Sequence, residues 1–181
     1  MSKTVLVVLI IVLCGAAVAY DNFHIPSSTD RAVHTENTGK PARTAAPDFT
    51  FSARDGSSLK LSDFKGRKIM LNFWATWCVP CIREFPLLID YAAKHQNDIV
   101  LIALSVDDPV DGKPVPLDKF FAKFPAEMQA DMKSPNIIIG YDPDKHISRD
   151  LFQVFRYPET YIISPDLYVD DKYVGSFPDT Q

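Results

Sequence analysis

This 181-residue chain contains two cysteines with a spacing typical of a reactive pair. They are Cys78 and Cys81, with two residues between them. Pro80 lies between them, and an apolar stretch precedes them. A Cys-x-x-Cys pair at the start of a helix most often forms a redox couple, in which one thiolate attacks a disulfide and the second cysteine releases the product. The third cysteine, Cys14, lies in an apolar leader. The loop between Cys78 and Cys81 is too short to gain much chain entropy as a structural staple, which favours a chemical role.

The order of the two cysteines predicts their roles. Apolar residues recur every three or four positions over residues 79–95, as on one face of a helix, and Cys78 directly precedes them. Unpaired N–H groups and the helix dipole favour negative charge there, so the pKa of Cys78 should lie below the ordinary thiol value of about 8.5. Cys78 is therefore the expected exposed nucleophile. Cys81, one turn further on, is the expected resolving thiol.

The elements around the pair predict an α/β domain. Residues 68–74 and 99–106 are apolar enough to form buried strands, and because a helix joins them they should form a parallel βαβ unit. A hairpin with an Asp-Gly turn should precede them, followed by a helical turn over residues 61–64 with Ser62 as its cap. The remaining expected elements are a helix over 117–133 that Pro125 breaks or bends, a strand over 136–139, a helix over 144–155, and strands over 160–163 and 168–174.

The first 46 residues have the composition of a leader and a tether. Residues 1–20 combine a positive start at Lys3 with an apolar stretch, which is typical of a signal peptide or a membrane anchor. The stretch falls just short of the roughly 20 residues that span a bilayer comfortably, and residues 17–19 match a small-x-small cleavage site, so both fates stay open. Either fate places the domain outside the cytoplasm, exported or anchored to the membrane. Polar residues 21–46 predict a flexible tether, and residues 47–181 the folded domain.

Composition narrows the range of partners. The net charge is -4 and the isoelectric point about 5.5, so the chain offers no basic stripe for phosphate, and we expect no nucleic-acid partner. Dithiol–disulfide exchange needs no bound cofactor, and none is expected. We expect a monomer.

The motif around the cysteines resembles a known family. Residues 72–86 are similar to the extracytoplasmic, thioredoxin-like TlpA/ResA/CcmG proteins; residues 47–49 with 61–66 are similar to the opening of that family, and residues 158–163 to its cis-proline segment. The resemblance covers residues 46–175 and implies a thioredoxin-like fold, with a central mixed β-sheet flanked by helices and an N-terminal β-hairpin. Relatives generally continue into a C-terminal helix. This chain stops at Gln181, six residues past Gly175, so we expect that helix to be missing.

The resemblance also implies an activity and a set of site residues. It implies an enzyme that reduces specific extracytoplasmic protein disulfides, for example in apocytochrome c, and that a membrane thiol-electron donor re-reduces. It places Glu84 beside the cysteines as an acid/base or pKa-tuning carboxylate, although the residue pattern alone fits an ordinary solvated helix charge equally well. It makes Pro158 a cis-proline that faces the cysteines, with Tyr157 shaping client choice. Trp77 and Pro80 complete the expected client-binding surface.

Other classes of protein remain open on the sequence alone. A metallochaperone of the copper-delivery type could bind a soft metal through Cys78 and Cys81, with His146 as a third ligand. The cysteines of such proteins are generally spaced one residue further apart, which disfavours this alternative. A peroxidase of the peroxiredoxin type is disfavoured because Thr76 does not supply the required Pro-x-x-x-Thr/Ser-x-x-Cys arrangement. A binding module without turnover is disfavoured because both cysteines are present.

Overall fold

The computed structural model describes residues 43–177. The expected leader over residues 1–20, Cys14 and nearly all of the expected tether lie outside the described residues. Within residues 43–177, no helix combines the length and the apolar character that crossing a bilayer requires.

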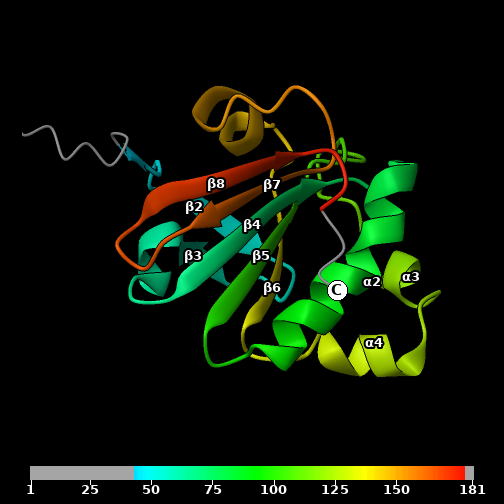
Figure 1. Cartoon of the computed structure of the whole chain (residues 1–181). Coiled ribbons are helices and arrows are strands. Elements are labelled where there is room, and N and C mark those ends of the chain that lie inside the picture. The colour runs from blue at the N-terminus through cyan, green and yellow to red at the C-terminus, as the bar shows by residue number, and fades with distance from the viewer. Residues whose placement is uncertain (1–42, 178–181) are drawn as a thin grey trace, which may run out of the picture. The chain divides into compact units, whose positions relative to one another are not determined.

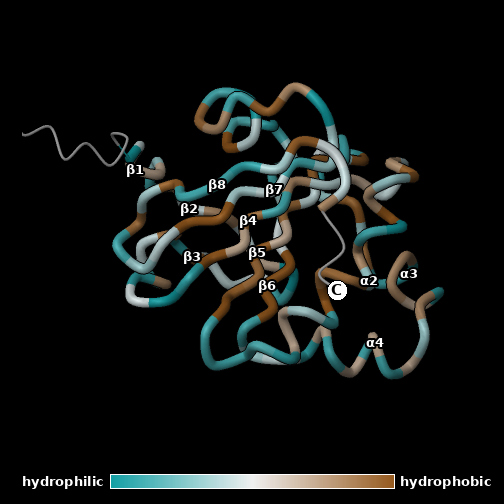
Figure 2. Tube along the Cα trace, in the orientation of Figure 1, coloured by the Kyte–Doolittle hydropathy of each residue, from teal (hydrophilic) through white to brown (hydrophobic). Residues whose placement is uncertain are grey.

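An eight-stranded mixed sheet organises the described chain, in the order β1-β8-β7-β4-β5-β6-β2-β3 (Figure 1). The three central parallel strands are β4 (Lys68–Trp74), β5 (Ile99–Ser105) and β6 (Ile137–Tyr141). The strands that pair antiparallel around them are β1 (Thr44–Ala45), β2 (Thr50–Ala53), β3 (Ser58–Lys60), β7 (Glu159–Ile163) and β8 (Tyr168–Val174). Every residue of β5 is buried, as expected for a parallel strand covered on both faces, whereas β8 is largely exposed. Figure 2 shows that β5 is also more hydrophobic than β8.

Helical segments cover both faces of this sheet. They are α2 (Val79–Lys94), α3 (Asp118–Phe121), α4 (Ala126–Asp131), the 3-10 turn η1 (Leu61–Phe64) and the π-helix η2 (His146–Leu151). Trp74 packs against Phe85 of α2, with ring centroids 4.6 Å apart, whereas its neighbour Phe73 packs against Phe152, directly after η2, at 5.5 Å. Successive strand residues point to opposite faces, so α2 and η2 cover opposite sides of β4 (Figure 1).

The thioredoxin-like class is confirmed, and two local expectations are wrong. The helix expected over residues 144–155 is the shorter η2. Lys145 and Gln153, on either side of it, have positive φ values of 60° and 55°, and the Asp142 carboxylate accepts the backbone N–H groups of Ile147 and Ser148 at 3.0 and 2.8 Å. These contacts confine the helical turns to the segment between the two left-handed residues.

The cap of η1 also differs from the expectation. The Asp63 carboxylate, rather than the Ser62 hydroxyl, accepts the N–H of the N-cap residue Lys60, at 2.7 Å. Ser62 lies within the turn, where its hydroxyl donates to Asp48 at 3.0 Å. The helix expected over residues 117–133 is divided into α3 and α4 at Pro125, as predicted.

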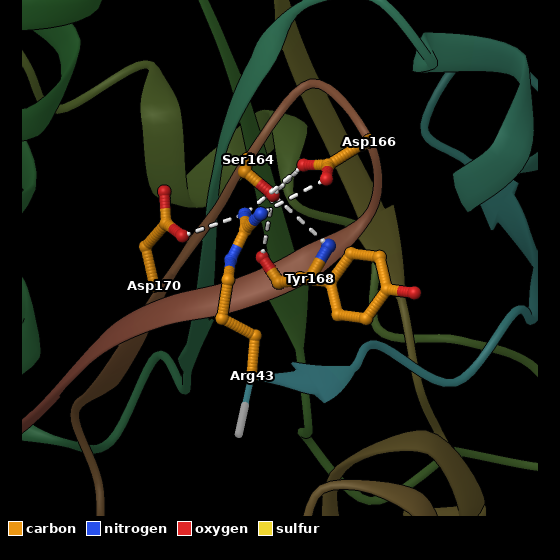
Figure 3. Close-up of polar contacts among 5 residues, drawn as sticks. All are labelled: Arg43, Ser164, Asp166, Tyr168 and Asp170. Atoms are coloured by element: carbon orange, nitrogen blue, oxygen red, sulfur yellow. Dashed lines mark hydrogen bonds and ion pairs between the residues drawn. The ribbon is translucent and has the colours of Figure 1, made fainter. Parts of the chain in front are cut away.

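The ordered sheet begins inside the range assigned to the tether. β1 pairs with Tyr168 and Val169 of β8. The guanidinium of Arg43 donates to both carboxylate oxygens of Asp166, at 2.9 and 3.0 Å, and to Asp170 at 2.8 Å (Figure 3). The same group lies 4.9 Å from the centroid of the Tyr168 ring. These contacts attach the start of the described chain to the β7–β8 hairpin.

The described residues that follow β8 form no helix. Residues 175–177 turn from the end of β8 towards α2 (Figure 1), and the Phe177 ring packs on Tyr173 with centroids 4.8 Å apart.

Candidate active site

The two cysteines lie at the N-terminus of α2, joined by a disulfide bond, with their Cα atoms 5.3 Å apart. Cys78 is the N-cap residue, and its sulfur accepts the backbone N–H of Cys81 at 3.3 Å. Pro80 occupies the first turn of the helix, where its missing N–H removes no helical hydrogen bond. Cys78 remains 5% exposed, whereas Cys81 is 0% exposed. In the oxidised protein the expectation of an exposed Cys78 is therefore wrong, because the disulfide holds both residues in the buried turn at the helix start; only the order of accessibility matches that of a nucleophile and a resolving thiol.

A buried carboxylate from the neighbouring strand end holds the loop before Cys78. Asp107, two residues after β5, accepts the backbone N–H of Thr76 at 3.1 Å and the Thr76 hydroxyl at 2.7 Å. The Ser105 hydroxyl donates to the same carboxylate at 2.6 Å. No sequence motif marks Asp107 as part of the site. The signal was its position just after a buried parallel strand, because the carboxyl ends of neighbouring parallel strands meet at one edge of the sheet.

Glu84 lies on α2, one helical turn beyond Cys81, and is 3% exposed. Its two oxygens accept hydrogen bonds from the Asn72 amide, at 3.1 Å, and from the backbone N–H of Phe177, at 2.7 Å. Burial raises the pKa of Glu84, and these two hydrogen bonds partly oppose the increase. The alternative of a solvated helix charge is therefore wrong.

Asn72 connects Glu84 to the strand that follows the cis-proline. Its amide nitrogen also donates to the Thr160 hydroxyl, at 2.9 Å, across the β4–β7 pair. Its amide oxygen is buried and has no hydrogen-bond partner among the described residues. The sequence alone did not indicate that Thr160 contacts Asn72 or that Phe177 contacts Glu84, because both contacts depend on how distant parts of the chain come together.

The Tyr157–Pro158 peptide bond is cis, as predicted. The Tyr157 ring meets the Trp77 ring edge-on, with centroids 6.1 Å apart, so this segment lies beside the residue that precedes Cys78. Trp77 is 60% exposed. Pro158 is buried, and its carbonyl accepts the N–H of Gly175 at 2.9 Å. Neither backbone group of Tyr157 has a backbone hydrogen-bond partner within residues 43–177.

The structure does not bring His146 together with Cys78 and Cys81 as a set of metal ligands. His146 begins η2, where its ring bonds to Asp150 at 2.9 Å. Across the part of the chain that the structure describes, no three His, Cys, Asp or Glu side chains are grouped as metal ligands would be. The combination of His146 with Cys78 and Cys81 is therefore wrong.

Comparisons with known proteins agree with this geometry. Residues 41–181 match the family model described as Redoxin. The thiol-disulfide oxidoreductase ResA of Oceanobacillus iheyensis is 32% identical over 137 residues, which cover 73% of this chain and 64% of that protein. The thioredoxin-like protein YneN of Bacillus subtilis is 30% identical over 131 residues, which cover 72% of this chain and 70% of that protein.

A solved structure shows the same architecture. A Chlorobium tepidum protein assigned as a thiol:disulfide interchange protein DsbE matches with a TM-score of 0.60 and 30% identity, covering 75% of this chain and 86% of that one. The chain spans 64% and 56% of the length of two curated ResA relatives that it matches. The family model extends over all of the described residues and over most of the chain. The chain therefore belongs to the Redoxin family.

Proposed function

We propose that this chain is a thiol–disulfide oxidoreductase that reduces disulfides in client proteins. The observation that carries the proposal is the Cys78–Cys81 disulfide at the N-terminus of α2, in which Cys78 is 5% exposed and Cys81 fully buried. Relatives named as thiol-disulfide oxidoreductases support the same chemistry.

The exchange proceeds in two steps. In the reduced protein, the Cys78 thiolate attacks one sulfur of the client disulfide, forms a mixed disulfide and expels the other client sulfur as a thiolate. The Cys81 thiolate then attacks the Cys78 sulfur, which releases the second client thiol and closes the Cys78–Cys81 disulfide. Two electrons pass to the client, so a second dithiol must re-reduce the protein. We propose a membrane thiol-electron donor in an extracytoplasmic compartment for this step, with the N-terminal segment as an anchor if it is uncleaved.

Glu84 supplies a proton acceptor for the second step in this proposal. Cys81 is 0% exposed in the oxidised protein, so a proton on its sulfur in the reduced state would have little direct contact with water. Glu84 lies three residues further along the same helix, so the two side chains are neighbours. A carboxyl whose pKa burial has raised is better matched to proton exchange near neutral pH than an exposed one.

The client binds beside Cys78, on the surface that Trp77, Pro80 and Tyr157 form; the buried Pro158 keeps the neighbouring peptide bond cis. An extended client strand would use the backbone groups of Tyr157, and its side chains would contact the exposed Trp77 ring. Apocytochrome c, whose haem-binding cysteines must be reduced before haem attachment, is one candidate client.

The proposal is tested with a client peptide that contains a Cys-x-x-Cys disulfide. The reduced protein should convert the peptide to its dithiol at a rate that depends on protein concentration. Mass spectrometry of the peptide measures this rate. Cys81→Ser should accumulate a mixed disulfide with the peptide, and Cys78→Ser should form none. If the wild-type protein leaves the peptide oxidised under reducing conditions, or if Cys78→Ser forms the adduct equally well, the proposed mechanism is wrong.

A further inference from the structure

Asp107 is a buried carboxylate that the exchange mechanism does not use. It is 5% exposed, and every group that contacts its oxygens is a donor: the N–H and hydroxyl of Thr76 and the hydroxyl of Ser105. This is the set of partners that an ionised carboxylate accepts. Among the described residues, the ion pairs formed by Lys, Arg and His do not include Asp107. Its negative charge is therefore stabilised by dipoles and is not cancelled by a cation.

This charge lies close to the nucleophilic cysteine. Thr76 precedes Cys78 by two residues, and two residues of chain span at most about 7 Å. The Asp107 carboxylate bonds directly to Thr76, so it lies within roughly 10 Å of the Cys78 backbone. Burial of Asp107 and of most of Cys78 keeps water from screening the interaction fully.

We propose that Asp107 is a positioning residue that holds the Thr76–Trp77 turn and, through its charge, disfavours the Cys78 thiolate, which makes the reduced protein a stronger reductant. Reduction of the Cys78–Cys81 disulfide takes two electrons and, depending on pH, one or two protons. When Cys78 remains a thiolate, the reduced protein has a negative charge that the oxidised protein lacks. Repulsion from Asp107 destabilises that form and lowers the reduction potential. The inference rests on the proposed function, for which it supplies a preferred redox direction.

Asp107→Asn removes the charge and keeps the shape. The Asn oxygen can accept both donors of Thr76, and its amide nitrogen can donate to the Ser105 hydroxyl oxygen. At an effective permittivity of about 20, two unit charges roughly 10 Å apart change an acid–base equilibrium about tenfold. We therefore expect about tenfold more Cys78 thiolate in the variant than in the wild type, at a pH below the midpoint of Cys78 ionisation. A tenfold change in the equilibrium constant of a two-electron couple corresponds to about 30 mV.

Two measurements on the full chain test the inference. The first is the rate of Cys78 alkylation by iodoacetamide against pH, followed by peptide mass spectrometry in a Cys81→Ser background. The second is the equilibrium of the Cys78–Cys81 pair with glutathione at several pH values. Asp107→Asn should lower the alkylation midpoint by about one pH unit and make the potential less negative. The difference in potential should vanish well below the midpoint and grow to a plateau above it, because only the thiolate interacts with the charge of Asp107.

Two matched variants separate this effect from general ones. Asp108→Asn removes a neighbouring carboxylate that is 78% exposed and ion-paired with Lys145, so solvent and Lys145 already screen it. Asp142→Asn removes a buried carboxylate that caps η2. Neither should move the alkylation midpoint of Cys78.

Two further variants should shift the alkylation midpoint of Cys78 in the opposite direction to Asp107→Asn. Ser105→Ala and Thr76→Val each withdraw a hydroxyl donor and leave the Asp107 charge less neutralised, so each should raise the alkylation midpoint. They also keep the test decisive if Asp107→Asn does not fold. If Asp107→Asn unfolds more easily in urea but keeps the wild-type alkylation profile and potential, Asp107 has a structural role alone and the inference is wrong. A wild-type protein that fails to reduce clients would refute the proposed function instead, because neither measurement uses a client.

Discussion

Replacing Glu84 with Gln should change stability in a way that depends on pH. Burial raises the pKa of Glu84, so the folded protein prefers the protonated carboxyl more strongly than the unfolded chain does. The stabilisation from this preference is fully present below the unfolded pKa of about 4.3 and is lost as pH rises through the folded pKa. Gln has no charge to bury at any pH. The variant should therefore gain stability relative to the wild type as pH rises, until Glu84 is fully ionised.

The structure supplies the direction of the effect and its geometric background. Each unit of difference between the folded and unfolded pKa corresponds to about 1.4 kcal/mol, so the plateau of the stability difference measures the shift directly. Gln can keep both hydrogen bonds: its oxygen accepts the N–H of Phe177, and its nitrogen donates to the Asn72 oxygen, now unpartnered, once that amide rotates. Glu84→Ala removes the acceptor of one buried N–H of the Asn72 amide, whose nitrogen still donates to Thr160, and the acceptor of the half-buried Phe177 N–H. The loss of the buried acceptor costs about 1–3 kcal/mol, so this variant should be the least stable of the three proteins at pH 4.

The assay is urea unfolding of the oxidised proteins from pH 4 to 9, with the free energy of unfolding of the wild type subtracted from that of the variant. Glu127→Gln, an exposed position on α4, is the matched control and should give a difference that hardly varies with pH. A difference for Glu84→Gln that is equally flat over this range would show that burial does not control Glu84.

Three other variants test the packing, the client surface and the π-helix. Gly140→Ala should destabilise the protein by about 1–3 kcal/mol in urea, because a Cβ there would lie 2.8 Å from Phe51 and 2.9 Å from the Ser52 carbonyl; an unchanged midpoint would contradict this packing. Trp77→Ala should raise the KM for the client peptide several-fold and leave the alkylation of Cys78 unchanged, and an unchanged KM would remove Trp77 from the client surface. Asp142→Ala should lower the free energy of unfolding by about 2 kcal/mol or more, because two buried N–H groups of η2 lose their acceptor. A wild-type profile in circular dichroism and urea unfolding would show that this cap is dispensable.

The sequence by itself was enough to place the redox pair and the elements that carry it. The apolar run that forms β5, the helical periodicity of α2 and the position of Cys78 just before that helix are local patterns, and each follows from residues within one or two turns of chain. The cis-proline was also predicted, although through family resemblance and not through any local propensity. The extent of η2 was not predicted, because left-handed residues and the Asp142 side chain limit it.

Only the tertiary structure decided what surrounds the sulfurs. Parallel pairing sets Trp74 opposite Ser105, which brings Asp107 to the Thr76 turn, and the path of the chain after β8 brings Phe177 to Glu84 across 93 positions of sequence. The sequence does not show whether water or protein donors contact a given carboxylate, because strand register determines its surroundings. For that reason the sequence could identify the cysteine pair, while the buried carboxylates around it became visible only in the folded sheet.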